Sequence, residues 1–111
     1  MKELDLKFPT CLIRNVLGRF ADKWSLLILC NLQAHDKMRY TEIRNAIPDI
    51  SQKMLTSSLK QLEKDHLLKR KAYAEIPPRV EYSLTELGIS LMPIIENMIE
   101  WAQVHFNEVT K

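Results

Sequence analysis

Hydrophobic residues recur at helical spacing along most of the chain, and each run begins next to a residue that can cap a helix. The expected capping residues are Thr10, Asp22, Thr41, Ser51 and Thr85. We expect the helix that follows Ser51 to end at about Asp65, and the last helix to continue to about Phe106. Pro93 lies inside the last helix and should kink or divide it.

Two segments have a strand pattern instead. Residues 80–84 alternate strictly, with Val80, Tyr82 and Leu84 on one face, and residues 67–73 precede them across a connection that contains Pro77-Pro78. Residues 38–40 suit a short strand. The order helix, helix, strand stub, helix, helix, hairpin, helix predicts a mainly α fold with a small β-hairpin, namely a winged helix-turn-helix. We expect an N-terminal arm over residues 1–9 and one domain over residues 10–107.

The helix after Ser51 is amphipathic. On a wheel of about 100° per residue, Leu55, Leu59, Leu62 and His66 form one stripe, which we expect to be buried. Lysines and neutral polar residues that suit phosphates and base edges occupy the opposite side. They are Gln52, Lys53, Thr56, Ser57, Lys60 and Lys64. A recognition helix in a DNA major groove needs such a face, although an ordinary solvated lysine face has the same pattern.

The charge distribution strengthens the nucleic-acid interpretation. The 111 residues carry a net charge of +2, but residues 37–79 contain ten basic and five acidic side chains, whereas residues 80–111 contain one basic and five acidic. Such a basic block favours a polyanionic partner. Arg79 adds a cation beside the stiff Pro77-Pro78 pair and suits a minor groove. Pairing of Arg79 with Glu75 or Glu81 is the alternative.

Other functional classes find little support. The two glycines lie outside any phosphate-binding motif, and no apolar run is long enough to span a bilayer. His35, His66 and His105 lie far apart without metal-ligand spacing, and no catalytic nucleophile motif is present. We therefore expect no enzyme activity, metal or cofactor, no membrane partner, and a cytoplasmic, nucleoid-associated location. Cys30 follows an aliphatic run and is interpreted as a buried, inert thiol.

The last helix is apolar on more sides than one core can cover, which predicts a homodimer. The first helix is the expected second component of the interface. The expected interface residues are Leu12, Val16, Ile95, Met98, Ile99 and Trp101.

Several sequence segments together resemble the HxlR-type family of bacterial winged-helix transcriptional regulators, which are related to the MarR group. They are residues 23–29 (KWSLLIL), 39–43 (RYTEI), 50–56 (ISQKMLT), 59–65 (LKQLEKD), 77–82 (PPRVEY) and 84–88 (LTELG). The resemblance implies dimers that bind operator DNA and repress or activate nearby genes. The chain departs from the family pattern at Leu12, where proline is common, and at His66, where glycine is common.

The resemblance also implies a sensor role for Cys11, because some members respond to oxidants or electrophiles through a cysteine at the start of the first helix. The positive field of the helix N-terminus and Arg14, one turn later, both favour the reactive thiolate. A cysteine that only packs is the alternative. A small-molecule or redox effector is therefore left open.

Two functions follow from these patterns. The first is a sequence-specific, dimeric DNA-binding transcriptional regulator that acts on a pseudo-palindromic operator. The alternative is a winged-helix protein-interaction module whose basic block docks an acidic partner. Gln52, Thr56 and Ser57 favour double-stranded DNA, because an acidic partner would need only the positive charge.

Overall fold

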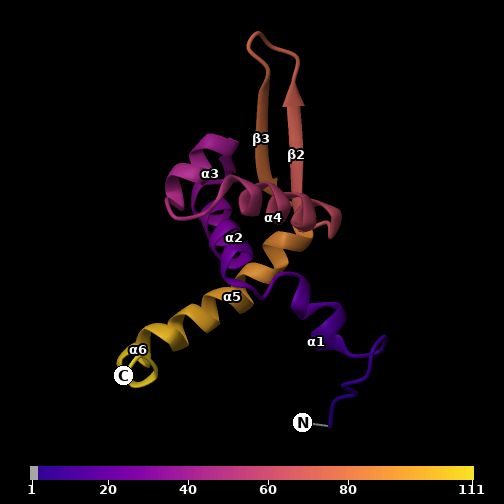
Figure 1. The fold of residues 1–111 in the computed structure, drawn as a ribbon, viewed down its shortest axis with the longest axis vertical. Coiled ribbons are helices and arrows are strands. Elements are labelled where there is room, and N and C mark those ends of the chain that lie inside the picture. The colour runs from indigo at the N-terminus through magenta and orange to yellow at the C-terminus, as the bar shows by residue number, and fades with distance from the viewer. Residues whose placement is uncertain (1–2) are drawn as a thin grey trace.

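The computed structural model describes residues 3–111 and places a hairpin on one side of a helical body, with two helical arms on the other (Figure 1). The elements in chain order are α1 (Leu12–Asn15), the short 3-10 helix η1 (Leu17–Arg19), α2 (Lys23–His35), β1 (Lys37–Met38), α3 (Tyr40–Ala46), α4 (Gln52–Lys64), β2 (Leu68–Tyr73), β3 (Arg79–Leu84), α5 (Glu86–Val104) and α6 (Phe106–Val109).

The strands form one antiparallel sheet in the order β1-β3-β2. In the hairpin, Leu68 lies opposite Leu84 at the base and Tyr73 opposite Arg79 at the far end. The stub β1 pairs with the base of β3 through Met38 and Tyr82. A helix-turn-helix formed by α3 and α4, followed by this two-stranded wing, confirms the predicted fold class.

Three of the five predicted helix caps are confirmed. The Asp22 carboxylate accepts a hydrogen bond from the Ser25 amide at 2.9 Å, and the Ser51 hydroxyl accepts one from the Met54 amide at 3.0 Å. Thr85 caps α5 in the same way. In each case a side-chain oxygen satisfies an amide that the first turn leaves without a partner.

The other two predicted caps are wrong. The Thr10 hydroxyl turns away from α1 and donates to the Asp5 carboxylate. Helix α3 begins at Tyr40, so that Thr41 lies within its first turn. The Arg39 amide, just before the helix, donates to the Glu42 carboxylate at 2.8 Å. A charged residue three positions into the helix has thus replaced the predicted hydroxyl cap.

The N-terminal helical segment is shorter than its apolar spacing predicts. Val16 leaves the helical conformation between α1 and η1, with φ −121° and ψ −65°. Short helices need tertiary packing, yet Leu12, Ile13 and Val16 are exposed, and between residues 12 and 20 only Phe20 is buried. The segment therefore has little core contact to hold one continuous helix.

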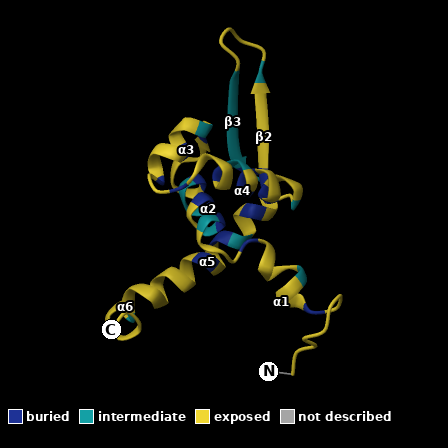
Figure 2. Cartoon of the chain, in the orientation of Figure 1, coloured by how far each residue is buried: buried dark blue, intermediate teal, exposed yellow. Residues whose placement is uncertain are grey.

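The core lies where α2, α4 and the beginning of α5 meet (Figure 2). Complete burial of one large aliphatic side chain stabilises a fold by about 1.5–3 kcal/mol, so this cluster fixes the relative positions of the three helices. Its most deeply buried members include Ile28, Leu29, Leu32, Ile43, Leu55, Leu59, Leu62, Leu68, Met92 and Ile95.

Two residues are not where the sequence pattern placed them. His66 was expected on the buried stripe of α4, but it is exposed, because the helix ends at Lys64 and His66 adopts the left-handed conformation with φ 64°. Ile95 was expected in a dimer interface, but only 1% of it is exposed, because it belongs to the core of the single chain.

Helix α5 runs through Pro93 without division, contrary to one of the two expected outcomes. Proline removes one backbone hydrogen bond from a helix interior. Met92 and Ile95 on either side of Pro93 are both buried in the core. Their packing holds the two parts of the helix together.

Gly88 marks the closest approach between α5 and the start of the wing. A Cβ atom at this position would lie 2.3 Å from the carbonyl oxygen of Leu67. We predict that Gly88→Ala lowers the free energy of unfolding by about 1–3 kcal/mol, because a backbone atom cannot yield as a flexible side chain can. Thermal or urea unfolding followed by circular dichroism measures this.

Gly18→Ala is the matched control, since its Cβ would lie 3.1 Å from the Ile13 carbonyl oxygen, a contact that a small shift relieves. An unfolding free energy for Gly88→Ala equal to or above that of Gly18→Ala would contradict this close approach.

Candidate nucleic-acid interface

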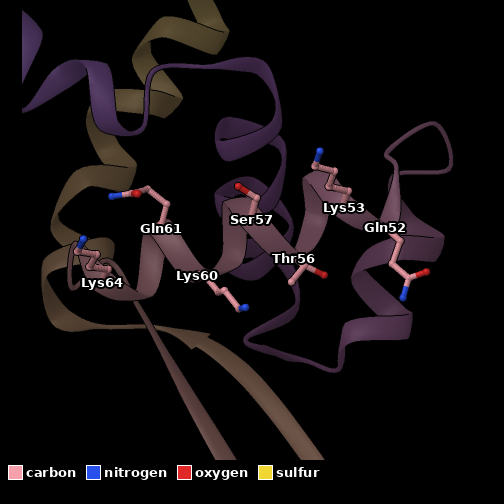
Figure 3. Close-up of a pocket in the computed structure, with 7 residues that line it drawn as sticks. All are labelled: Gln52, Lys53, Thr56, Ser57, Lys60, Gln61 and Lys64. Carbon is pink, nitrogen blue, oxygen red and sulfur yellow. The ribbon is translucent and has the colours of Figure 1, made fainter.

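Helix α4 turns one face into the core and the opposite face to solvent. Leu55, Leu59 and Leu62 are buried, as the wheel predicted, and Ser58 is buried with them. The outer face lines a shallow hollow (Figure 3). The lining residues are Gln52, Lys53, Thr56, Ser57, Lys60, Gln61 and Lys64.

The sequence pattern identified all of these lining residues except Gln61. Gln61 lies about 40° beyond Ser57 on the wheel, so the same periodicity could have included it. The seven side chains are three lysines and four neutral amide or hydroxyl residues, with no carboxylate among them. The arrangement can hold phosphates through its lysines and exchange hydrogen bonds through its neutral groups.

A second hollow lies between α4 and the wing. Its cationic side chains are Lys60 from α4 and Arg70 from β2, and Glu63 is its acidic member. Arg70 belongs here because alternation along β2 places it opposite Tyr82, which also lines the hollow. The cationic surface thus extends from α4 onto the base of the wing.

Tyr40 of α3 contributes to this hollow, whereas the sequence pattern placed it in a short strand over residues 38–40 and did not assign it to the site. Its hydroxyl lies 3.3 Å from the Gln52 carbonyl oxygen and 3.3 Å from the Thr56 hydroxyl. The contact joins the two helices of the helix-turn-helix and orients Thr56. It depends on the tertiary angle between α3 and α4, which no local pattern encodes.

Arg79 does not project freely from the wing. Its guanidinium carbon lies 4.1 Å from the centre of the Tyr73 ring, and its Nη2 lies 3.1 Å from a carboxylate oxygen of Glu75. Of the two pairings left open, the structure has the one with Glu75. Only 29% of the Arg79 side chain is exposed.

The two cysteines are free and differ in environment. Cys11 is 2% exposed and directly precedes α1. Cys30 is half-buried, and its pKa is raised, first by burial and second by the negative charge of Glu96. The prediction of a buried Cys30 is therefore wrong in part, because the half-buried thiol lines an open apolar hollow between α2 and α5 together with Met98.

The predicted dimer residues other than Ile95 form exposed apolar surface on the two arms (Figure 2). Leu12 and Val16 lie on the N-terminal arm, and 59% of Trp101 is exposed on α5. Met98 and Ile99 are exposed beside it.

Between residues 3 and 111, no group of three or more His, Cys, Asp or Glu side chains is arranged to hold a metal ion. None of the described helices has both the length and the hydropathy needed to cross a bilayer.

Comparison with known proteins gives the same picture as the geometry. An uncharacterized HTH-type transcriptional regulator of Methanothermobacter thermautotrophicus is 42% identical over 95 residues, which cover 86% of this chain and 72% of the relative. The uncharacterized HTH-type regulator YdeP of Bacillus subtilis is 38% identical over 104 residues, which cover 94% of this chain and 80% of YdeP.

Solved structures of transcriptional regulators are similar to this chain in both fold and sequence. The redox regulator HypR in its reduced form superimposes with a TM-score of 0.82 at 36% identity, covering 88% of this chain and 96% of HypR. The reduced transcriptional regulator YodB from B. subtilis gives a TM-score of 0.73 at 34% identity, covering 87% and 92%. The family model described as HxlR-like helix-turn-helix matches residues 19–110. With nearly the whole winged helix inside that match, the chain belongs to the HxlR-like helix-turn-helix family.

Proposed function

We propose that the protein is a sequence-specific transcriptional regulator that binds double-stranded DNA with α4 in the major groove. The observation that carries this proposal is the outer face of α4, where Lys53, Lys60 and Lys64 line one hollow together with neutral hydrogen-bonding groups and without a carboxylate. Lysines hold the phosphate backbone, and amide and hydroxyl groups distinguish base edges. Membership of a helix-turn-helix family supports this proposal.

In this arrangement the wing lies beside the DNA backbone. Lys69 and Lys71 are exposed on β2, and Arg79 lies at the far end of the hairpin. A wing cation there suits an adjacent minor groove. The protein acts at the nucleoid, in the cytoplasm, without a catalytic step or cofactor.

A module that docks an acidic protein is the second candidate. The same lysines would serve it, but a purely electrostatic partner gives Gln52 and Thr56 no role. Tyr40 holds Thr56 in one orientation, which favours base readout over charge alone.

Substitutions on α4 separate phosphate contact from base readout. Lys60→Ala should weaken binding to all duplexes and reduce the slope of log affinity against log salt by about one unit. Gln52→Ala or Thr56→Ala should instead change the preference among variants of the operator, by about 1–3 kcal/mol per lost base contact. Fluorescence anisotropy with the chain's own promoter region, at several salt concentrations, measures both.

Lys111→Ala, at the far end of the C-terminal arm, is the matched control and should leave both quantities unchanged. If all three α4 variants bind promoter and random DNA like the wild type, α4 is not the recognition helix.

We further propose that two copies associate through the arms. The Cα radius of gyration is 15.9 Å, whereas a compact chain of this length has about 13 Å. The wing and the arms, which extend from opposite sides of the body, account for the difference, and the C-terminal arm provides apolar surface for a second copy with exposed Trp101, Met98 and Ile99. A two-fold pair places two recognition helices on a roughly palindromic operator, with half-sites about one turn or a small multiple apart.

Light scattering at micromolar concentration should therefore give the mass of a dimer. Ile99→Asp, which puts a charge into the apolar surface, should shift the mass to that of a monomer while the circular dichroism spectrum is retained. Gln103→Asp, an exposed polar position on the same helix, should remain dimeric. A monomeric wild-type chain at micromolar concentration would rule out this association.

We also propose that Cys11 is the sensor of an oxidant or electrophile. The similar structures of HypR and YodB include an oxidized HypR and a diamide-treated YodB. Cys11 is 2% exposed and lies within the N-terminal arm, directly before α1, so an adduct on its sulfur requires the neighbouring residues of the arm to rearrange. Because the arm belongs to the proposed dimer surface, this movement changes the spacing of the two recognition helices.

A quinone, which adds directly to a thiolate, tests this role. Treatment should reduce promoter affinity in the wild type and in Cys30→Ser but not in Cys11→Ser. The raised pKa of Cys30 leaves less thiolate at neutral pH, which makes Cys30→Ser the suitable control. An unchanged response in Cys11→Ser, or no response in the wild type, would show that Cys11 only packs.

A further inference from the structure

The far end of the wing holds a cluster of charges around one aromatic ring. Both the Lys71 ammonium and the Arg79 guanidinium approach the Tyr73 ring, at 4.9 Å and 4.1 Å from its centre. Tyr73 and Arg79 are cross-strand partners, as are Lys71 and Glu81, two pairs nearer the base and on the same face. Glu75, in the connection between β2 and β3, completes the cluster through its ion pair with Arg79.

Arg79 is the most restrained cation of this surface. The lysines on α4 are exposed, and none has an ion-pair partner within 4.0 Å among residues 3–111. The Arg79 guanidinium, by contrast, stacks on the Tyr73 ring and forms an ion pair with the Glu75 carboxylate. Its charge is therefore already neutralised in the free protein.

The restraint leaves one polar group unsatisfied. The Nε atom of Arg79 is buried and has no hydrogen-bond partner. A buried donor without a partner is unfavourable, which offsets part of the stabilisation that Arg79 gains from Tyr73 and Glu75. An acceptor that draws the guanidinium off the ring gives Nε a partner and compensates for the loss of Glu75.

We propose that Glu75 is an internal counter-ion that holds Arg79 on the Tyr73 ring until a DNA acceptor replaces it, and that Glu75 thereby limits binding to DNA of arbitrary sequence. This inference rests on the proposed function. On a random duplex, only phosphates compete with Glu75 for the guanidinium, so Arg79 stays paired and contributes little counter-ion release. On a site where the wing meets a fitting minor groove, base-edge acceptors add to the phosphates and take over the guanidinium.

The exposed position of Glu75 makes this exchange easy. Half of its side chain is exposed, and ion pairs at such sites are weak. Glu75 therefore favours the paired position of Arg79 only weakly, and a DNA acceptor displaces it at little cost. Removal of the Glu75 charge should increase the affinity for random DNA more than the affinity for the promoter. The ratio of promoter affinity to random-DNA affinity should therefore fall.

Glu75→Gln tests the proposal, because it removes the charge and keeps the size of the side chain. Binding of a short random-sequence duplex should tighten by about 1.5- to five-fold, the range that an exposed ion pair allows. The slope of log affinity against log salt should become steeper by about 0.9, the value for one additional phosphate contact. Fluorescence anisotropy at several salt concentrations gives both quantities, with the promoter duplex measured in parallel.

Glu81→Gln is the matched control. Glu81 lies on the same face of the hairpin, two residues from Arg79, and has no ion-pair partner within 4.0 Å among the described residues. It loses the same charge at nearly the same place without releasing Arg79. An equal gain in affinity and slope for Glu81→Gln would show a general effect of charge and would overturn the proposal.

The double variant Glu75→Gln/Arg79→Gln separates the pair from its surroundings. If Glu75 acts through Arg79, the gain from Glu75→Gln disappears in the Arg79→Gln background. A gain that persists there contradicts the proposal, as does a wild type that binds random DNA no more weakly than Glu75→Gln. If the wild type binds neither duplex, the proposed function fails; if it binds and Glu75→Gln changes nothing, only the role of Glu75 fails.

Discussion

Burial of the apolar side of α4 is the constraint on which the rest of the molecule depends. Leu55, Leu59 and Leu62 have almost no exposed surface and pack in the same cluster as Ile28 of α2. A helix fixed along one side can present only the opposite side to solvent. The direction of the lysine and amide side chains in Figure 3 is therefore a consequence of core packing.

The cationic surface has one part on α4 and one on the wing. The two parts differ in whether their positive side chains already have a partner in the free protein. On α4 the lysines are exposed and separated by neutral groups, so they meet a polyanion without first leaving a partner. On the wing, Arg79 stacks on Tyr73 and pairs with Glu75. In the proposed function the first set supplies general attraction, and the second responds to the shape of the bound duplex.

The sequence predicts most of this architecture because its strongest signals are local. Periodicity located α2, α4 and α5, three side-chain caps marked their beginnings, and strict alternation located β3. The failures occur where tertiary contacts decide. The pattern predicts that Ile95 is surplus apolar surface, yet Ile95 is buried in the core. Tyr40 contacts Thr56 only because α3 crosses α4. The partner of Arg79 remained open between Glu75 and Glu81, since both lie within reach in the sequence and only the path of the connection selects Glu75.

The most direct test of the central claim is a map of backbone amide chemical shifts during titration with a promoter duplex. The account predicts the largest changes along residues 52–64 of α4 and along residues 69–80 of the wing, which face the same side of the body (Figure 1). Residues 89–104 of α5, on the arm that extends away, should change little. Changes concentrated on α5, with α4 unaffected, would contradict the account.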